Sequence, residues 1–261
     1  AGYPFRYVLE PVPGHSAARN RAVEEAGCEI VAFMDDDMTA DTNWLVATAE
    51  PFADPSVMGV QGLVLPSELE TDAQELFELE YGGFGLGFER RVFRPGMRWE
   101  YGLPALCFDT GPYMAFRREV FEEVGGFDLS LGAPIGGGED TDLLHRVLRA
   151  GQSLVYTPKA IRYHRHRETM KGLECQLRGY GRGYTALLAK CLMEEPEARR
   201  GACRRMADYY YHWVARRWVR KALGREKMPY RMVFAECAGA LGGPAAYLRM
   251  RARLRRKPRI H

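Results

Sequence analysis

The sequence predicts an α/β fold in which a mostly parallel sheet is flanked by helices and followed by a helical extension. In the first half, apolar runs of strand length alternate with helical patterns, as in a parallel α/β sheet. One of these runs, Ile30 to Met34, stops at three consecutive carboxylates, and ligands of such sheets bind where strands end. The last third is helical by pattern, so we expect a boundary between residues 1–167 and residues 168–261.

The first half supplies the expected elements in chain order. Residues 5–11 form a first strand, a helix begins near Ser16, and the apolar run up to Met34 forms the next strand. After a further helix, residues 57–65 form another apolar strand. Residues 67–81 are helical by pattern, and the stretch after them is rich in glycine and aromatics without a clean period, which is typical of a binding loop.

The second half begins with two apolar pieces, one ending near Thr110 and one spelled YMAF, followed by a short helix that Gly125 ends. A helix then starts at a glycine-rich loop, and two short strands lie around Pro158. Three helices with apolar stripes and many arginines complete the chain, over residues 169–195, 196–223 and 228–256.

Composition limits the classes of protein. A chain of 261 residues with 46% hydrophobic content can bury a real core, and the net charge of +3 does not argue for nucleic acid. The six cysteines lack CxxC spacing, which favours reduced thiols over disulfides or zinc. No apolar run reaches the roughly 20 residues of a transmembrane helix. Because the chain starts at Ala1 and enters a strand almost at once, we expect that an upstream part is missing.

The carboxylates Asp35, Asp36 and Asp37 form the first charged centre. In an extended chain Asp35 and Asp37 share a face, and they repel each other unless a cation lies between them and a ligand. A divalent metal that carries phosphates is the natural counter-charge. The alternative is an acidic turn that caps the next helix, but one cap needs one carboxylate, and Asp41 is available for it.

Two further positions are candidates for contacts with an anionic ligand. Arg19 and Asn20 lie in the first turns of a helix, where exposed amides and the positive end of the dipole can hold an anion. The alternative is a solvated helix face. Gly111 would let a ligand approach the backbone closely, and a plain turn glycine is the alternative there.

The second charged centre follows the triple glycine of residues 136–138. Glu139, Asp140 and Asp142 lie in the first turn of a helix, where acidic side chains are stabilised by the dipole even without a catalytic role. A carboxylate on a rigid helix start beside a glycine loop is also a good general base. Asp142 lies about 200° round the helix from Asp140, so it should face away from the substrate side of Asp140.

A His-x-His pair comes last. His164 and His166 lie on one face if the chain is extended, and a lone histidine is usually structural. Combined with the upstream Asp run, one of the two becomes a candidate metal ligand, because imidazole often joins carboxylates at Mn-like sites. The sequence leaves open which of the two binds.

Taken in order, SAARNRAVEEAGCEIVAFMDDD, DTGPYMAFRREVFEEVGGFD, GGGEDTDLLHRVLRAG and YHRH resemble the family 2 glycosyltransferases, which have the GT-A fold. The resemblance covers about residues 5–185. It implies a nucleotide-sugar donor, a divalent cation (Mn or Mg) and inversion at the anomeric carbon. It also implies that residues 1–167 are a GT-A (Rossmann-like) catalytic domain without its first strands.

Carried over residue by residue, the resemblance assigns roles at both charged centres. Asp35, with Asp36 beside it, looks like the nucleotide-side carboxylate, and Asp37 and His164 look like metal ligands. Asp140 looks like the base that deprotonates the acceptor hydroxyl, and Glu139 would orient the acceptor or the base. The chain departs from the family at Tyr113, where an Asn is usual, and in lacking the opening strand and first nucleotide-binding loop.

The expected acceptor is a glycan or a lipid-linked sugar, as in polysaccharide biosynthesis, and we expect a cytoplasmic enzyme at the inner face of the cell membrane. Trp213 and Trp218 beside several arginines suit an interfacial helix near anionic lipid, and a solvated helical cap is the alternative. Two other functions remain open: a metal-dependent nucleotidyltransferase and a non-catalytic carbohydrate-binding protein.

Overall fold

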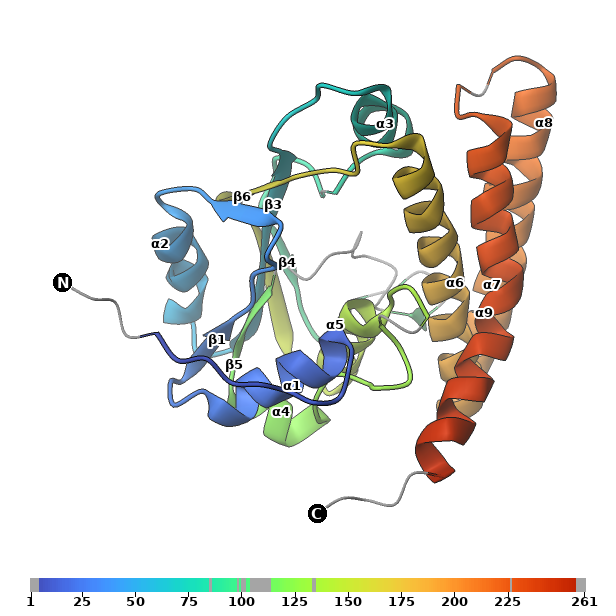
Figure 1. Ribbon diagram of the computed structural model, residues 1–261. Coiled ribbons are helices and arrows are strands. Elements are labelled where there is room, and N and C mark those ends of the chain that lie inside the picture. Colours follow the sequence, from blue (N-terminus) through green and yellow to red (C-terminus); the bar gives the residue numbers. More distant parts are fainter. Residues whose placement is uncertain are drawn as a thin grey trace.

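The protein is described by a computed structural model. It defines residues 5–84, 86–97, 99, 102–103, 114–132, 135–225 and 227–256, without the side chains of residues 212–214. A mixed sheet lies between helices, and a column of long helices runs beside it (Figure 1). Gly111 and Tyr113 lie outside the described residues.

The sheet has the strand order β1-β5-β3-β6-β2, with β4 paired to β6 as well. Among the described ladders, β3–β6 is parallel and the others are antiparallel, so the prediction of a mostly parallel sheet is wrong in this respect. The strands span Ile30–Ala32 (β1), Met38–Ala40 (β2), Val57–Pro66 (β3), Arg91–Phe93 (β4), Met114–Arg117 (β5) and Ser153–His164 (β6).

The position of β5 explains the difference. Strands β1 and β3 both pair antiparallel with β5, and β6 runs parallel to β3, so β1, β3 and β6 share one direction as the alternating pattern predicts. Met114, the first residue of β5, pairs with Gln61 in the middle of β3, and Phe116 pairs with Gly59 nearer its start. Strand β5 therefore runs back along β3 and lies between β1 and β3. A short apolar run fits either direction, so the sequence does not reveal this reversal.

The described helices include all those that the sequence pattern predicts. The bounds are His15–Glu25 (α1), Trp44–Ala49 (α2), Asp72–Glu75 (α3), Glu119–Val124 (α4), Glu139–Arg149 (α5), Met170–Glu194 (α6), Arg199–Asp208 (α7), Arg216–Ala222 (α8) and Tyr230–Arg256 (α9). A 3-10 turn, η1 (Glu50–Ala53), follows α2. The π-helical turn η2 (Leu76–Tyr81) extends α3, and η5 (Tyr209–Ala215) joins α7 to α8.

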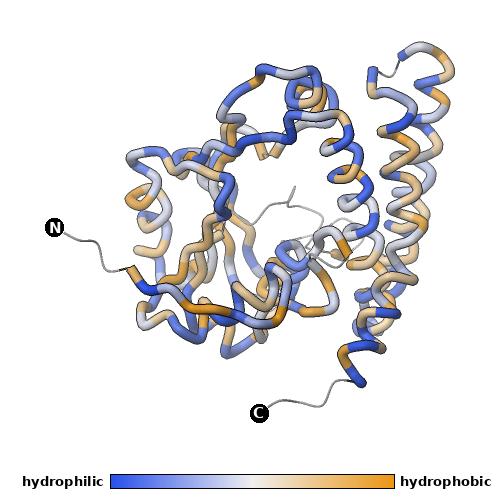
Figure 2. The backbone as a smooth tube through the Cα atoms, viewed as in Figure 1, coloured by the Kyte–Doolittle hydropathy of each residue, from blue (hydrophilic) through white to orange (hydrophobic). Residues whose placement is uncertain are grey.

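Helices cover both faces of the sheet because side chains alternate along each strand. Phe116 of β5 packs in one cluster with residues of α4 and α5, while its neighbour Ala115 packs on the opposite face with Phe52 of η1. Figure 2 shows hydrophobic colours along much of the chain at the centre of the sheet, as expected for strands that are covered on both faces. This packing fixes the height and rotation of α5 against the sheet.

Two predicted strands differ in the structure. Residues 5–11 have no regular secondary structure and join no ladder, and Phe5 and Tyr7 are exposed. The two short strands predicted around Pro158 are one continuous strand, β6. Its register against β3 shifts between Thr157 and Ile161, and this bulge accommodates a proline that has no N–H to donate.

The C-terminal helices pack closely against each other and against the sheet region. A Cβ on Gly181 or Gly239 would lie within 2.3 Å of backbone atoms on the facing helix, so α6 and α9 touch through glycine. Leu173 and Leu177 of α6 share a buried cluster with Val64 of β3, so the hydrophobic core continues across the predicted boundary at residue 167. Within the described ranges, the helices are all too short or too polar to cross a membrane.

Candidate active site

The three carboxylates follow the buried end of a strand, as predicted. Val31 of β1 is buried, and the N–H of Phe33 donates to the carbonyl of Met114 at 3.0 Å, which ties the strand end to β5. The loop from Asp35 to Asp37 then leads into β2. Asp35 and Asp37 are half-buried and Asp36 is exposed, so the two outer carboxylates are those that the fold holds in place.

Arg19 of α1 connects this loop to the start of α5. Its guanidinium is buried and donates to Asp35 at 3.1 Å, to Glu139 at 3.2 Å and to Asp140 at 2.7 Å. It also lies over the ring of Phe127, 5.5 Å from the centroid. The anions that Arg19 holds are therefore carboxylates of the protein, and the two charged centres predicted from the sequence form one site, the Arg19 cluster (Arg19, Asp35, Glu139 and Asp140).

The glycine loop and the apolar face of α5 set the direction of Glu139 and Asp140. Gly136, Gly137 and Gly138 all have positive φ angles, of 114°, 136° and 97°. This loop packs on α6, where a Cβ on Gly183 would come within 2.8 Å of the backbone of Gly137. Residues with side chains would strain this backbone and separate the two segments.

The electrostatics of the Arg19 cluster are unbalanced. Three carboxylates surround one guanidinium. Burial and the neighbouring Glu139 raise the pKa of Asp140 well above its ordinary value, and Arg19 only partly opposes this. One carboxylate oxygen of Glu139, Oε2, is buried without a hydrogen-bond partner in the described residues. A carboxylate that holds its proton more tightly than usual is a stronger base once it is ionised.

Asp142 faces the other side of α5, as its spacing predicts. Its carboxylate accepts from Lys190 at 2.6 Å and from Nε of Arg146 at 2.8 Å, and Lys190 also contacts Asp128 at 2.6 Å. Asp142 and the Lys190 side chain are both buried. We refer to Lys190, Asp128, Asp142 and Arg146 as the Lys190 cluster; its two cations balance its two carboxylates.

The predicted metal ligands Asp37 and His164 lie together. Met38 pairs with His164 in the β2–β6 ladder, which places Oδ2 of Asp37 3.5 Å from Nε2 of His164. Burial lowers the pKa of His164, although Asp37 partly opposes this, so the imidazole is neutral at neutral pH, as a metal ligand must be. A carboxylate oxygen and a neutral imidazole at this separation fit one Mn or Mg ion, with diphosphate oxygens free to complete its coordination.

His166 occupies a supporting position. Its Nδ1 lies 3.0 Å from Nδ1 of His164, and its Nε2 lies 2.9 Å from Oε2 of Glu78. Of the two histidines, His164 is therefore the one whose Nε2 reaches the Asp run. Glu78 comes from η2, 88 residues away from His166, and no local signal in the sequence indicates the contact.

The side chain of Asn20, predicted as a candidate anion contact, binds the protein backbone. Its amide nitrogen donates to the carbonyl of Phe127 at 2.9 Å, and its oxygen accepts from the N–H of Phe127 at 2.7 Å. Both ends of the amide are thus used to hold α1 against the segment after α4. The structure does not bring the Asn20 side chain to the Arg19 cluster.

A second group of metal-ligating side chains lies between α5 and α6. His145, Cys191 and Glu195 place one ligand atom each within 4.8 Å of the others. His145 is bonded to both carboxylate oxygens of Glu195, at 3.0 and 2.9 Å, and Arg149 contacts the same carboxylate. Burial and Glu195 raise the pKa of Cys191, which disfavours the thiolate. The carboxylate of Glu195 is thus held by His145 and Arg149, beside a thiol whose raised pKa keeps it protonated.

Comparison with known proteins gives a family for the first part of the chain. Residues 1–125 match Glycosyl transferase family 2, which confirms the resemblance over this part of the chain. The motifs at residues 136–151 and 163–166 lie beyond the matched range. With the mixed sheet between helices, this match also confirms the predicted α/β class.

Two curated relatives have named activities. The pre-mycofactocin glycosyltransferase of Mycobacterium tuberculosis is 29% identical over 67% of this chain and 35% of its own length. The glucosyl-dolichyl phosphate glucuronosyltransferase of Haloferax volcanii is 29% identical over 46% of this chain and 36% of its own. The chain thus spans about a third of the length of either relative.

Among solved structures, glucosyl-3-phosphoglycerate synthase from M. tuberculosis, in complex with Mn²⁺, UDP and glucosyl-3-phosphoglycerate, superposes with a TM-score of 0.43. It has 17% identity over 71% of this chain and 56% of that one.

Proposed function

Since residues 1–125 belong to glycosyl transferase family 2, we propose that the protein transfers a sugar from a nucleotide-sugar donor to a hydroxyl of a glycan or lipid-linked acceptor, with inversion. The observation that carries this proposal is the Arg19 cluster. It joins the nucleotide-side carboxylate Asp35 to Asp140, a carboxylate whose pKa is raised. Because Arg19 binds both Asp35 and Asp140, it would hold the donor-side carboxylate and the base close together, as a reaction between donor and acceptor requires.

On the donor side, Asp37 and His164 would hold the divalent cation, Mn or Mg, and Asp35 and Asp36 lie where they can face the nucleotide. When bound, the cation neutralises the negative charge that develops on the leaving diphosphate. The support for this assignment is the 3.5 Å separation between Asp37 Oδ2 and His164 Nε2, together with the neutral imidazole.

On the acceptor side, Asp140 takes the proton of the attacking hydroxyl. Ionised Asp140 accepts from Arg19 through Oδ1 at 2.7 Å, which leaves its second oxygen for the acceptor. Glu139 lies beside it and accepts from the same guanidinium at 3.2 Å, so it acts on Asp140 through Arg19 and through its own charge. Arg19 fixes the orientation of both carboxylates, and its charge keeps Asp140 ionised over more of the neutral range.

The side chains where α8 ends and α9 begins support a lipid-linked sugar as the acceptor. Trp218, Val219 and Tyr230 are large apolar side chains that are exposed there. Trp218 packs on Tyr230 with ring centroids 5.9 Å apart, and the Lys221 ammonium lies 5.1 Å from the Tyr230 ring. Aromatic and basic side chains together suit contact with an anionic membrane surface, and the name of the Haloferax relative includes a dolichyl phosphate. On this basis we propose that the enzyme works at the inner face of the cell membrane.

The test is metal-dependent donor binding and transfer. A panel of nucleotide sugars with Mn or Mg should give transfer to added sugar acceptors, and the anomeric configuration of the product should be inverted. Asp37→Ala should weaken metal-dependent binding of nucleoside diphosphate by about tenfold or more in calorimetry, because the ligand pair is broken.

Asp41→Ala is the matched control, since it removes a nearby carboxylate that accepts from the N–H of Asn43 at the start of α2. Equal metal-dependent affinity in Asp37→Ala and Asp41→Ala would contradict the metal assignment. Transfer of the nucleotidyl group with release of sugar 1-phosphate, in place of sugar transfer, would instead indicate a nucleotidyltransferase.

A further inference from the structure

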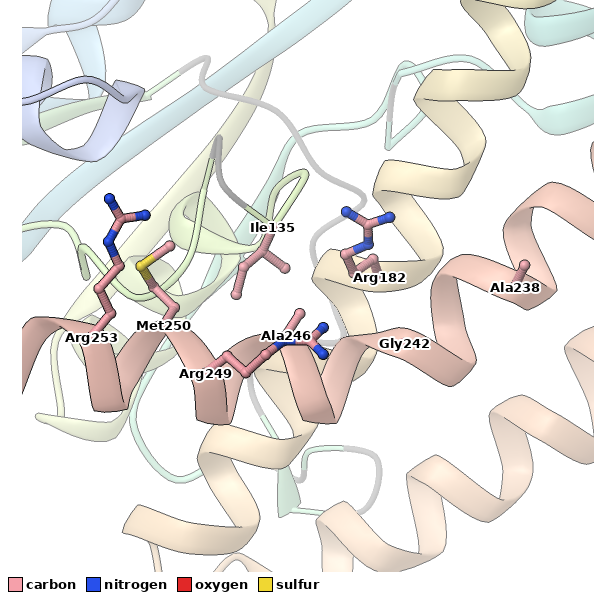
Figure 3. A pocket seen from close by; sticks show the side chains of 8 residues that line it. All are labelled: Ile135, Arg182, Ala238, Gly242, Ala246, Arg249, Met250 and Arg253. Carbon is pink, nitrogen blue, oxygen red and sulfur yellow. The ribbon is translucent and has the colours of Figure 1, made fainter.

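A cavity of about 350 Å³ lies between α6, α9 and the loop that leads into α5. Arg182 of α6 and Arg249 and Arg253 of α9 line it, and Ile135 and Met250 supply apolar walls. Figure 3 shows Ile135 between Arg182 on one side and Arg253 with Met250 on the other. The cavity shares no residue with the Arg19 cluster or with the Asp37–His164 pair.

The three arginines have no acidic partner in the described part of the chain. Within the described ranges, no side-chain hydrogen bond and no ion pair involves Arg182, Arg249 or Arg253. Other arginines of the same helices do have partners: Arg178 contacts Glu174 at 3.6 Å, and Arg251 contacts Glu194 at 3.2 Å. Arg182 is half-buried and Arg249 and Arg253 are exposed, so water weakens the repulsion among the three charges, and an anion between them would remove it.

Close helix packing brings these charges together. A Cβ on Gly243 would lie 2.5 Å from the carbonyl oxygen of Arg182, so α9 rests directly on the backbone that carries this arginine. Arg249 and Arg253 are four residues apart on α9 and therefore share a face of the helix. Glycine at the contact fixes the spacing of the guanidinium groups across the two helices.

We propose that this cavity binds a phosphate group of a ligand that also has an apolar part. Guanidinium groups match the oxygens of phosphate in pairs and stay charged at every physiological pH. The cavity is larger than one phosphate needs, and Ile135, Ala246 and Met250 give the rest of the ligand an apolar surface. The phosphate can come from a lipid headgroup or from a soluble phosphate ester. Because Ile135 precedes the glycine loop of α5, the bound group lies against the segment that carries Asp140.

Binding is measured without turnover, so the result does not depend on the proposed sugar transfer. The full chain is titrated with inorganic phosphate and with glycerol 3-phosphate in the presence of a metal chelator. The chelator keeps the carboxylates around Asp35 and Asp37 without a cation, and they then repel phosphate. In a second arm the chain is mixed with phosphatidylcholine vesicles, with and without phosphatidic acid.

The variant is Arg182→Gln/Arg249→Gln, and the matched control is Arg255→Gln, which removes an exposed charge from the same helix α9 outside the cavity. We expect the double variant to bind phosphate or phosphatidic acid vesicles at least about tenfold more weakly, and the control to bind as the parent does. Binding in the first arm alone assigns a soluble ester, and phosphatidic acid dependence in the second assigns a lipid.

Thermal unfolding of each variant with and without phosphate separates loss of the site from loss of the fold. A folded double variant that phosphate no longer stabilises supports the proposal. If the double variant and Arg255→Gln weaken binding equally, the effect is a general surface charge and the site is refuted. Absence of binding by the parent chain in both arms refutes it as well.

Discussion

Helix α5 carries a cluster of buried charges on each of two faces, and the two clusters differ in balance. The Lys190 cluster contains two carboxylates and two cations. Burial alone would raise the pKa of Asp128, but its contacts with Lys190 and Ser130 outweigh this and lower the pKa below its ordinary value. The Arg19 cluster sets three carboxylates against one cation, and the pKa of Asp140 is raised.

On this difference we base the proposal that, within a single helix turn, the balanced cluster is structural and the unbalanced cluster is catalytic. In the balanced network the charged groups bind one another, which stabilises the packing of α5 on α6 and leaves few hydrogen-bond donors or acceptors available to a ligand. The unbalanced network retains a carboxylate with a raised pKa, which costs stability and to which we assign the role of base in the proposed transfer.

The largest expected effect is on turnover in Asp140→Asn. The amide keeps the shape and most hydrogen bonds of Asp140 but accepts no proton, so kcat should fall by about 100-fold or more while donor affinity stays the same. The matched variant is Asp142→Asn, two residues further along α5. Steady-state transfer per folded molecule should be close to normal in Asp142→Asn, and full turnover in Asp140→Asn would show that the base is another residue.

The next effect is on stability in Lys190→Met. Removing this ammonium leaves Asp142 and Asp128 facing each other, so the free energy of unfolding should fall by about 3 kcal/mol at neutral pH. Because the folded pKa of Asp128 is lowered, the stabilisation is present above the ordinary aspartate pKa and is lost as pH falls through the folded value. The deficit of the variant should therefore shrink in acid.

Urea unfolding at several pH values measures this deficit. Lys171→Met, an exposed charge on the same helix α6, is the control and should change stability little. A deficit that stays constant from neutral to acid pH would show that Lys190 contributes by packing and not by charge.

A smaller effect concerns the pH dependence of transfer. Asp140 acts as a base only when ionised, so activity should fall as pH drops through its raised pKa. Arg19→Gln removes the cation that lowers this pKa, so the acid limb should move to higher pH, and turnover at pH 7 should fall roughly tenfold and recover as pH rises. Glu139→Gln removes a neighbouring negative charge, so its acid limb should move the opposite way.

The exposed Arg21→Gln on the same helix α1 is the control for Arg19→Gln, because Arg21 pairs with Glu24 and Glu25 outside the cluster. If the acid limbs of Arg19→Gln and Glu139→Gln move in the same direction, the two side chains do not act on Asp140 through their charges.

Part of this site could be predicted from the sequence because its signals are local. A strand that ends in Asp35 to Asp37 and a helix that starts with Glu139 and Asp140 identify both charged centres, and two-residue spacing places Asp142 on the other face. The sequence also indicates that Arg19 meets an anion.

The rest depends on contacts between distant parts of the chain. Arg19 and Asp140 are 121 residues apart, and Glu78 and His166 are 88 apart. The reversed direction of β5 likewise depends on its pairing with β1 and β3, and a short apolar run is compatible with either direction. Local pattern carries no information on which partner a buried charge finds.

The most direct measurement of the central comparison is a carboxyl titration by NMR of Asp140 and Asp128 in one sample. Selective labelling of aspartate carboxyl carbons, with Asp140→Asn and Asp128→Asn for assignment, gives both pKa values under identical conditions. We predict that Asp140 titrates above the ordinary aspartate value and Asp128 below it, because one cluster lacks cations and the other has them. An Asp140 pKa at or below that of Asp128 would contradict the account.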